Sequence, residues 1–405
     1  MIPAELQDLY DLTPMVRMML LGVLLAIGPL LWVGWRQRKT GPLGRRQALT
    51  LLTLFLTFDL ILFGAFTRLS DSGLGCPDWP GCYGQASPIG AQAQIEAAQA
   101  ALPSGPVTRG KAWIEMIHRY LATGVGVLIL VLAVTAWLQP GSVQRRRPVA
   151  LSDSPHGGPS DLPGISPWWP TFTLVWVCIQ GAFGALTVTM KLFPAIVTLH
   201  LLGGLTLLAL LGAQYVALAR ISRPGLVKHA PVGLRWLLVF AFGLLVLQIA
   251  LGGWVSTNYA VLACSDFPKC QNSWWPAMNF EQGFTLWRHL GMTEHGEPIA
   301  FEALTAIHYV HRLMAYALVG LLVFLAWRMQ RAGWTQASRW IAALTALQVA
   351  SGLSNVVLGW PLLAALMHTG GAAALVLALT FCLAALPSRS RASSSFVQPA
   401  LRRVV

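Results

Sequence analysis

Apolar residues run in long, nearly uninterrupted stretches along this chain of 405 residues. Each stretch reaches about 20 residues, the length at which a helix spans the hydrocarbon of a bilayer. The stretches cover residues 15–35, 48–66, 113–137, 168–189, 194–219, 234–255, 303–327, 338–359 and 361–386. Acidic residues precede the first one and no small-residue cleavage site follows it, so we interpret it as a helix and not as a signal peptide. The pattern predicts an all-α integral membrane protein with about nine spans.

The charges are few and unevenly placed. Only 11% of the residues are charged, whereas a soluble domain carries about a quarter. The formal charge of +13 could suggest a nucleic-acid partner, but the basic clusters follow the first, third, fifth, seventh and ninth spans. The positive-inside rule places those loops in the cytoplasm. We therefore expect a multi-pass protein of the bacterial inner membrane with a periplasmic N-terminus, a cytoplasmic C-terminus and no nucleic-acid partner.

The polar segments repeat. The segment "GAFTRLSDSGLGCPDWPGC" (64–82) aligns with "GGWVSTNYAVLACSDFPKC" (252–270) at an offset of 188 residues. Further on, "IHRYLA" matches "VHRLMA", "IQGAFGALTV" resembles "LQVASGLSNVV", and "TLHLLGGL" matches "LMHTGGAA". Each copy holds four spans, an even number, so both enter the membrane in the same orientation. The repeat predicts two four-helix transmembrane bundles related by a pseudo-two-fold axis along the membrane normal.

This repeat divides the chain into four parts. Residues 1–47 form an extra N-terminal helix with a basic loop, 48–219 the first bundle, 220–386 the second, and 387–405 a cytoplasmic tail. The stretch 139–167 is rich in Arg, Ser, Pro and Gly and is predicted to be a connector. The segment 90–102 has high helix propensity and predicts a short helix at the membrane surface.

Five of the nine histidines fall within spans, where an ionisable side chain is by default a functional hypothesis. Four of them lie on the second and fourth helices of their copies, about 8–12 Å below the outer edge at 1.5 Å per residue; these are His118, His200, His311 and His368. Hydrogen bonds across helices would explain one or two such residues, but not a duplicated pair at one depth. Zinc prefers three or four ligands, whereas two imidazoles suit the axial positions of heme iron. We therefore expect one heme in each bundle. The histidines outside the spans, His156, His229, His289 and His295, are interpreted as solvated loop residues.

Two features accompany the histidine pairs. Arg119 and Arg312 follow the second-helix histidines and would reach heme propionates, or else snorkel to the interface. Four glycines follow the fourth-helix histidines and would admit a flat macrocycle or pack helices; they are Gly203, Gly204, Gly370 and Gly371.

The two copies differ at one position near the histidines. Glu115 lies three residues before His118, on the same helix face, where the second copy has His308. A carboxylate beside one heme alone suggests chemistry in the first bundle and electron storage in the second, although it could simply bond a partner helix.

Four of the six cysteines lie in two outer loops with the same spacing, "CPDWPGC" and "CSDFPKC". Each pair could close a small ring, because disulfides persist in an oxidising compartment. Cys178 and Cys382 lie within spans and are interpreted as packing residues.

Taken together, "ExxHR" at Glu115 to Arg119, "HR" at His311, the histidines His200 and His368, and "TRLSDSGLGCPDWPGC" resemble the heme A synthase family over nearly the whole chain. The resemblance implies oxidation of the C8 methyl of heme O to a formyl group, giving heme A for cytochrome c oxidase assembly. It also implies that His118, His200 and Arg119 bind the substrate heme, that Glu115 assists oxidation, and that His311, His368 and Arg312 bind heme b. The loop with Cys76 and Cys82 resembles a functional disulfide of some members, and we expect Cys264 and Cys270 to be linked as well.

The resemblance implies partners too. They are the heme O synthase (a farnesyltransferase) that makes the substrate, cytochrome c oxidase assembly factors, membrane lipid and an electron carrier that the sequence does not identify. The oligomeric state stays open between a monomer and a homo-oligomer.

Two other classes remain to be weighed. A di-heme b-type membrane cytochrome for electron transfer explains the histidines equally well but gives no reason for Glu115 or the cysteine loops. A transporter built from parallel repeats predicts helices broken near the midplane, whereas Pro194 and Pro361 stand at helix starts.

Overall fold

The computed structural model describes residues 13–138, 165–226 and 230–387. The N-terminal residues, most of the predicted connector with His156, the loop residue His229 and nearly all of the predicted tail lie outside these ranges. Within them the chain is helical and contains nine helices that are long and apolar enough to cross a membrane. The predicted all-α membrane fold is therefore confirmed.

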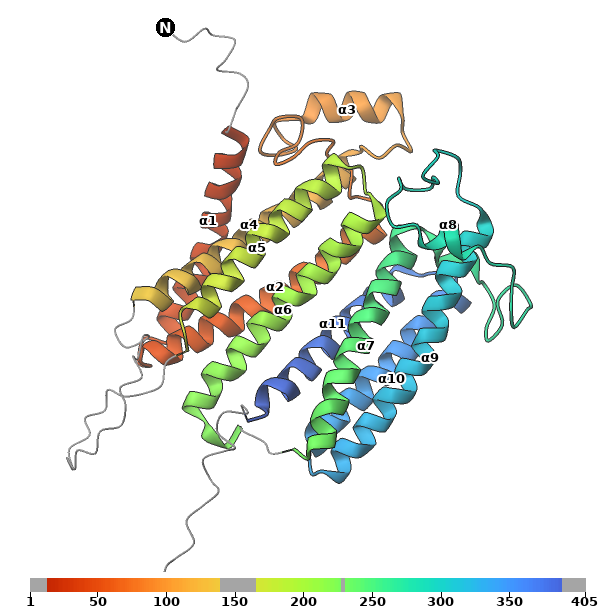
Figure 1. The fold of residues 1–405 in the computed structure, drawn as a ribbon. Helices are drawn as coiled ribbons and strands as arrows, with labels where there is room; N and C mark the ends of the chain where they lie inside the picture. The colour runs from red at the N-terminus through yellow and green to blue at the C-terminus, as the bar shows by residue number, and fades with distance from the viewer. Residues whose placement is uncertain (1–12, 139–164, 227–229, 388–405) are drawn as a thin grey trace, which may run out of the picture.

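The spanning helices agree closely with the apolar stretches. They are α1 (Thr13–Arg36), α2 (Pro42–Leu69), α4 (Arg109–Leu138), α5 (Trp168–Thr189), α6 (Pro194–Ser222), α7 (Val232–Thr257), α9 (Phe301–Arg331), α10 (Thr335–Val357) and α11 (Leu362–Ala385). Proline stands at the first turn of α2 and α6, where its missing N–H costs no hydrogen bond. Two short helices, α3 (Gln92–Ala101) and α8 (Phe280–Phe284), lie at the same end of the molecule (Figure 1). α3 is the predicted surface helix.

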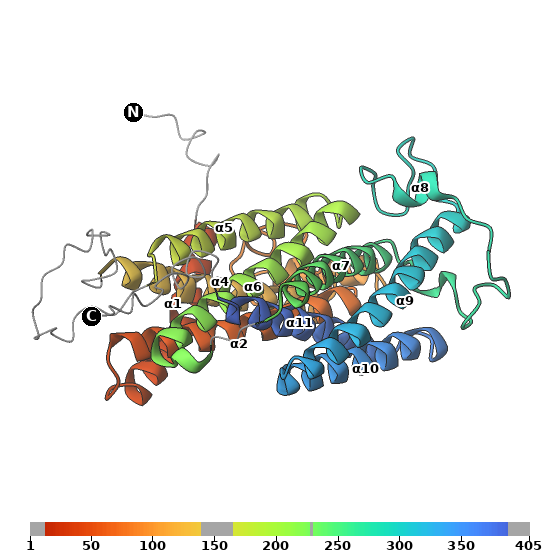
Figure 2. The ribbon, with the colours of Figure 1, turned by 60° about the horizontal axis from the view of Figure 1, so that its bottom comes forward.

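The helices pack as two bundles. In the first, α2, α4, α5 and α6 contact one another around the ring; in the second, α7, α9, α10 and α11 do the same. The bundles meet where α6 contacts α11 and α7, and where α2 contacts α11 (Figure 2). In the repeat, α2 corresponds to α7 and α6 corresponds to α11. The α6–α7 contact and the α11–α2 contact are therefore equivalent, as a pseudo-two-fold axis between the bundles requires.

Two side-chain contacts locate this axis at the outer ends of α2 and α7. The Arg68 guanidinium donates to the Ser256 carbonyl at 2.5 Å, and the Tyr259 hydroxyl donates to Asp71 at 2.7 Å. Both pairs are separated by 188 residues, the offset between the two copies. Residues related by a two-fold rotation can touch each other only on its axis, so the axis passes between these pairs.

The extra helix α1 packs chiefly along α4. A Cβ atom on Gly22 would lie 2.4 Å from Thr123 Cγ2, and Gly124 faces Leu25 and the Gly22 carbonyl. Small residues on both sides therefore let the two backbones approach closely, as membrane helices commonly do. The second bundle has no described counterpart of α1.

Candidate heme sites

The structure brings the four predicted histidines together in two pairs. His118 on α4 interacts electrostatically with His200 on α6, and His311 on α9 interacts with His368 on α11. The sequence register placed each histidine on its helix, and the bundle packing brought the two members of each pair near one another. Each bundle therefore presents two half-buried imidazoles from two helices that run in the same direction.

A glycine of a neighbouring helix lies beside each imidazole. A Cβ atom added to Gly64 would lie 2.9 Å from His118 Cε1, and one added to Gly252 would lie 2.9 Å from His311 Cε1. The corresponding distances are 3.4 Å from Gly184 to His200 and 3.1 Å from Gly352 to His368. Any larger side chain would press on the ring, so these glycines leave each imidazole room to keep its orientation. The sequence analysis missed all four, although Gly64 and Gly252 match across the repeat.

Three glutamines hold the backbone at the histidines. Gln180 donates to the His200 carbonyl at 2.8 Å, Gln348 to the His368 carbonyl at 2.9 Å, and Gln248 to the His311 carbonyl at 3.1 Å. Because the helix hydrogen bonds still leave each carbonyl a lone pair, the amide adds a tie between neighbouring helices. Gln180 and Gln348 occupy matching places in the repeat, which is the signal that could have identified them.

The glycines after the fourth-helix histidines serve this packing. A Cβ on Gly203 would lie 2.1 Å from Gln180, one on Gly371 would lie 2.3 Å from Gln348, and one on Gly370 would lie 2.8 Å from Leu62. These contacts favour a role in helix packing over a role in admitting a flat macrocycle.

The residues present fit a heme in each bundle. The part of the chain that the structure describes has no group of three or more His, Cys, Asp and Glu side chains placed to bind one metal ion. A pair of facing imidazoles is instead the donor set of a six-coordinate heme. In the first bundle, moreover, the Nδ1 atoms of His118 and His200 are buried and have no hydrogen-bond partner among the described residues.

Glu115 and Arg119 point to the outer cysteine loop. Glu115 is buried, its Oε2 accepts from the Cys76 amide at 2.8 Å, and its other oxygen pairs with Arg119. Arg119 also donates to the carbonyls of Asp78 at 2.9 Å and Gly81 at 2.5 Å. The pair therefore fastens the loop to α4 one turn from His118.

The second copy builds the same loop around Arg312. This guanidinium donates to the carbonyls of Asp266 at 2.9 Å and Lys269 at 2.7 Å. His308, at the position of Glu115, places Nδ1 3.0 Å from the Ala260 carbonyl and Nε2 3.4 Å from Arg312. Both arginines thus bind loop carbonyls, a role that the sequence analysis did not foresee, and their contact with heme propionates stays a prediction.

The loops are also closed covalently in the structure. Cys76 is bonded to Cys82 and Cys264 to Cys270, with Cα atoms 4.9 and 4.7 Å apart. Asp78 accepts hydrogen bonds from the Tyr83 and Gly84 amides, and Asp266 accepts from Gln271 and Asn272. At Asp266, slight burial acts to raise the carboxyl pKa, but the amides of Asn272 and Gln271 outweigh it, and the pKa lies below its usual value.

The remaining cysteines and loop histidines lie outside this site. Both cysteines are free and lie within spans; Cys382 is buried, as expected of a packing residue, whereas Cys178 is exposed on α5. His295 is exposed as expected for a solvated residue. His289 is exposed too, and its ring contacts the ring of Phe193 edge-on at 5.6 Å.

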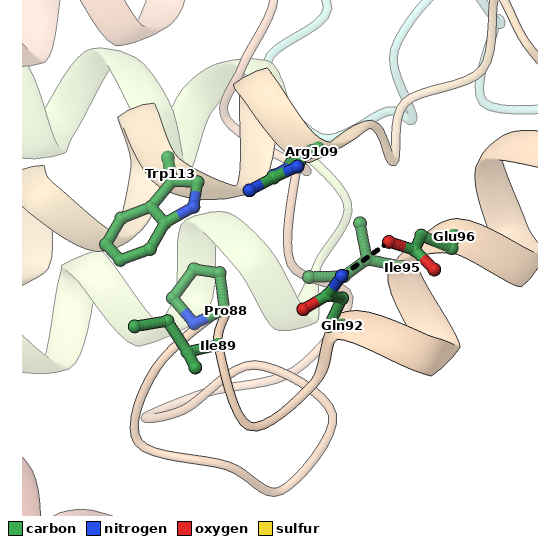
Figure 3. A pocket seen from close by; sticks show the side chains of 7 residues that line it. All are labelled: Pro88, Ile89, Gln92, Ile95, Glu96, Arg109 and Trp113. Carbon is green, nitrogen blue, oxygen red and sulfur yellow. Dashed lines mark hydrogen bonds between the residues drawn. The ribbon is translucent and has the colours of Figure 1, made fainter.

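A small recess lies between α3 and the start of α4 (Figure 3). Its volume is about 40 Å³, and its lining includes Gln92 and Glu96, which share a hydrogen bond of 2.7 Å. No histidine lines it. The recess is therefore not part of the heme sites.

Comparisons with known proteins identify the family of the chain. The COX15-CtaA family, described as cytochrome oxidase assembly protein, matches residues 47–380. The heme A synthase of Shewanella oneidensis is 37% identical over 81% of this chain and 92% of its own length. The heme A synthases of Rhizorhabdus wittichii and Halalkalibacterium halodurans are 25% and 24% identical, over 84% and 76% of this chain and 95% and 86% of their own lengths. The chain belongs to the cytochrome oxidase assembly protein family that includes the heme A synthases.

Proposed function

We propose that this protein is a heme A synthase that oxidises the C8 methyl of heme O to a formyl group. The observation that carries the proposal is the duplicated pair of neighbouring imidazoles, each beneath a cysteine loop, in a chain of this family. Among the described residues, the first pair differs in having a carboxylate, Glu115, one helical turn before its first histidine. The first bundle, residues 48–219, is therefore the substrate side, and the second bundle, residues 220–386, holds heme b.

The chain's residues position the substrate. His118 and His200 would hold the iron of heme O, and Gly64 and Gly184 leave their rings room. The methyl carbon would lose two electrons in each of two oxidations, first to the alcohol and then to a geminal diol, which loses water to give the aldehyde; the four electrons would pass to an external acceptor. Heme b, held by His311 and His368, supplies one-electron redox chemistry when bound.

Glu115 acts at the outer edge of this site. Its carboxylate is bonded to the Cys76 amide and to Arg119, so it keeps the loop against α4. A buried carboxylate there also stabilises positive charge or exchanges a proton during oxidation. Arg119 and Arg312 shape the two loops and lie one residue from the ligands, within reach of propionates on the same side.

The orientation follows from the charges. The basic loops face the cytoplasm and the cysteine loops face the periplasm of a bacterial inner membrane. Heme O arrives from its farnesyltransferase in the same membrane, and heme A leaves toward cytochrome c oxidase assembly factors. The electron carrier is a separate component.

Identification of the bound hemes tests the proposal. Hemes extracted from the purified protein are expected to include heme b together with heme O or heme A, by mass and by absorption. His311→Ala and His368→Ala are expected to lose heme b. Two hemes b per chain, with no heme O or A and no conversion of added heme O, would support a di-heme cytochrome instead.

A further inference from the structure

The two histidine pairs differ in what their outer ring nitrogens contact. In the second bundle, His368 Nδ1 lies 3.1 Å from Ser351 Oγ, whereas His311 Nδ1 accepts from the Gln248 side-chain NH2 at 3.0 Å. In the first bundle, the Nδ1 atoms of His118 and His200 are buried without a partner among the described residues.

The repeat shows which substitutions cause this difference. Gly64 and Gly252 contact matching histidines, so α2 and α7 are in register and Leu60 corresponds to Gln248. In the same way Gly184 and Gly352 bring α5 and α10 into register, and Phe183 corresponds to Ser351. Thus each polar partner in the second bundle is replaced by an apolar residue in the first.

The hydrogen-bond direction at His368 suits a metal ligand. Ser351 donates its own proton to the Leu347 carbonyl at 2.7 Å, so its oxygen is free to accept from His368 Nδ1–H. That bond fixes the tautomer in which Nε2 carries the lone pair for iron. A partner on the outer nitrogen orients the ring and makes the ligand more basic, and its loss typically weakens metal binding about 10- to 100-fold.

We infer that Ser351 makes the second bundle a site that retains its heme, whereas Phe183 at the matching position makes the first bundle a site that releases it. The inference rests on the proposed function, because an enzyme that acts on heme must let its product go while keeping its cofactor. These two residues act through the histidines and are positioning residues.

The test measures heme loss and not only activity. Purified protein is mixed with excess apomyoglobin, and the transfer of each heme is followed by absorption and by mass. For Ser351→Ala we expect heme b to leave about 10- to 100-fold faster than from the unchanged protein. Ser351→Thr, which keeps the hydroxyl, should restore retention, and Ser354→Ala, which removes an exposed hydroxyl of the same helix, should change nothing.

The reciprocal change is made in the first bundle. Phe183→Ser introduces a hydroxyl where Ser351 has one, and Phe183→Ala makes the same truncation without it. We expect heme O or heme A to leave the serine variant at least about tenfold more slowly than the alanine variant. Unchanged heme b loss from Ser351→Ala, or equal rates for the two Phe183 variants, would overturn the inference. Either result could be obtained while the unchanged protein still makes heme A, so the inference can fail while the proposed function holds. If the unchanged protein makes no heme A, the proposed function itself fails.

Discussion

At the scale of single residues, the difference between the copies matters more than their likeness. Glu115 and His308 stand at one position, and each bonds the outer loop through a different atom: the carboxylate accepts from an amide, and the imidazole contacts a carbonyl. The loops are therefore held in both bundles, but among the described residues the carboxylate at this position belongs to the first bundle, one helical turn before His118. This is the difference on which a catalytic role depends.

Glu115→Gln is expected to separate binding from chemistry. Its amide oxygen can still accept from Cys76, but the side chain cannot carry a negative charge or move a proton. Heme b content should stay unchanged while heme A output falls about 10²- to 10⁴-fold, as is typical for loss of one acid–base group. Output is measured by extraction of hemes from membranes, with Glu96→Gln on the exposed face of α3 as the control. Accumulated alcohol would assign Glu115 to the second oxidation and accumulated heme O to the first; near-normal heme A would make the carboxylate structural.

At the scale of elements, α1 and the first cysteine loop, with Cys76 and Cys82, both pack on α4. Met18 of α1 is buried in one cluster with Cys76, Cys82 and Met116. Thr123, which meets Gly22, also donates to the Arg119 carbonyl at 2.8 Å. In the second copy, Tyr316 of α9 occupies the position of Thr123. Tyr316 is exposed, because no described helix packs on α9 as α1 packs on α4. The extra helix is therefore fitted to the first bundle.

Gly22→Leu should show what α1 contributes. The added side chain collides with Thr123, and such overpacking costs about 1–3 kcal/mol. We expect a lower midpoint of thermal unfolding in detergent and less heme bound by the first bundle. Gly28→Leu is the matched control, because a Cβ at Gly28 has no atom within 4 Å. Equal stability of the two variants would contradict a close α1–α4 contact.

The two disulfides give a prediction for the loops. Because both cysteine pairs are expected in the periplasm and lie within bonding distance, protein isolated without reductant should resist thiol labelling at all four positions. After reduction, four further thiols per chain should react, which mass spectrometry can count and locate. Four free thiols in the unreduced protein would show that the loops close without these bonds.

At the scale of the whole molecule, the nine candidate spans of the described residues predict that Thr13 and Pro387 lie on opposite sides of the membrane. The exposed loop residue His295 should then face the periplasm, and exposed Lys39 should face the cytoplasm. A membrane-impermeant maleimide applied to intact spheroplasts should label His295→Cys but not Lys39→Cys, and should label both after lysis. Labelling of Lys39→Cys in intact spheroplasts would reverse the proposed orientation.

Much of this architecture is determined by the sequence itself. Span lengths follow from bilayer thickness, and the duplication appears as a repeat in the amino-acid sequence. A histidine within an apolar helix is conspicuous because burying an ionisable side chain in the membrane is costly. Local patterns of this kind depend on neighbours in the chain, so they predicted the spans, the two bundles and the four histidines.

Only the tertiary structure decided what the polar side chains touch. Arg119 contacts carbonyls 38 to 41 residues away, Gln180 reaches the His200 carbonyl, and Arg68 meets Ser256 across the pseudo-two-fold axis. These partners are backbone groups, which every residue carries, so no residue type in the sequence marks them. The direction of a side chain between two helices depends on their crossing and rotation, which are fixed only when all the helices pack together.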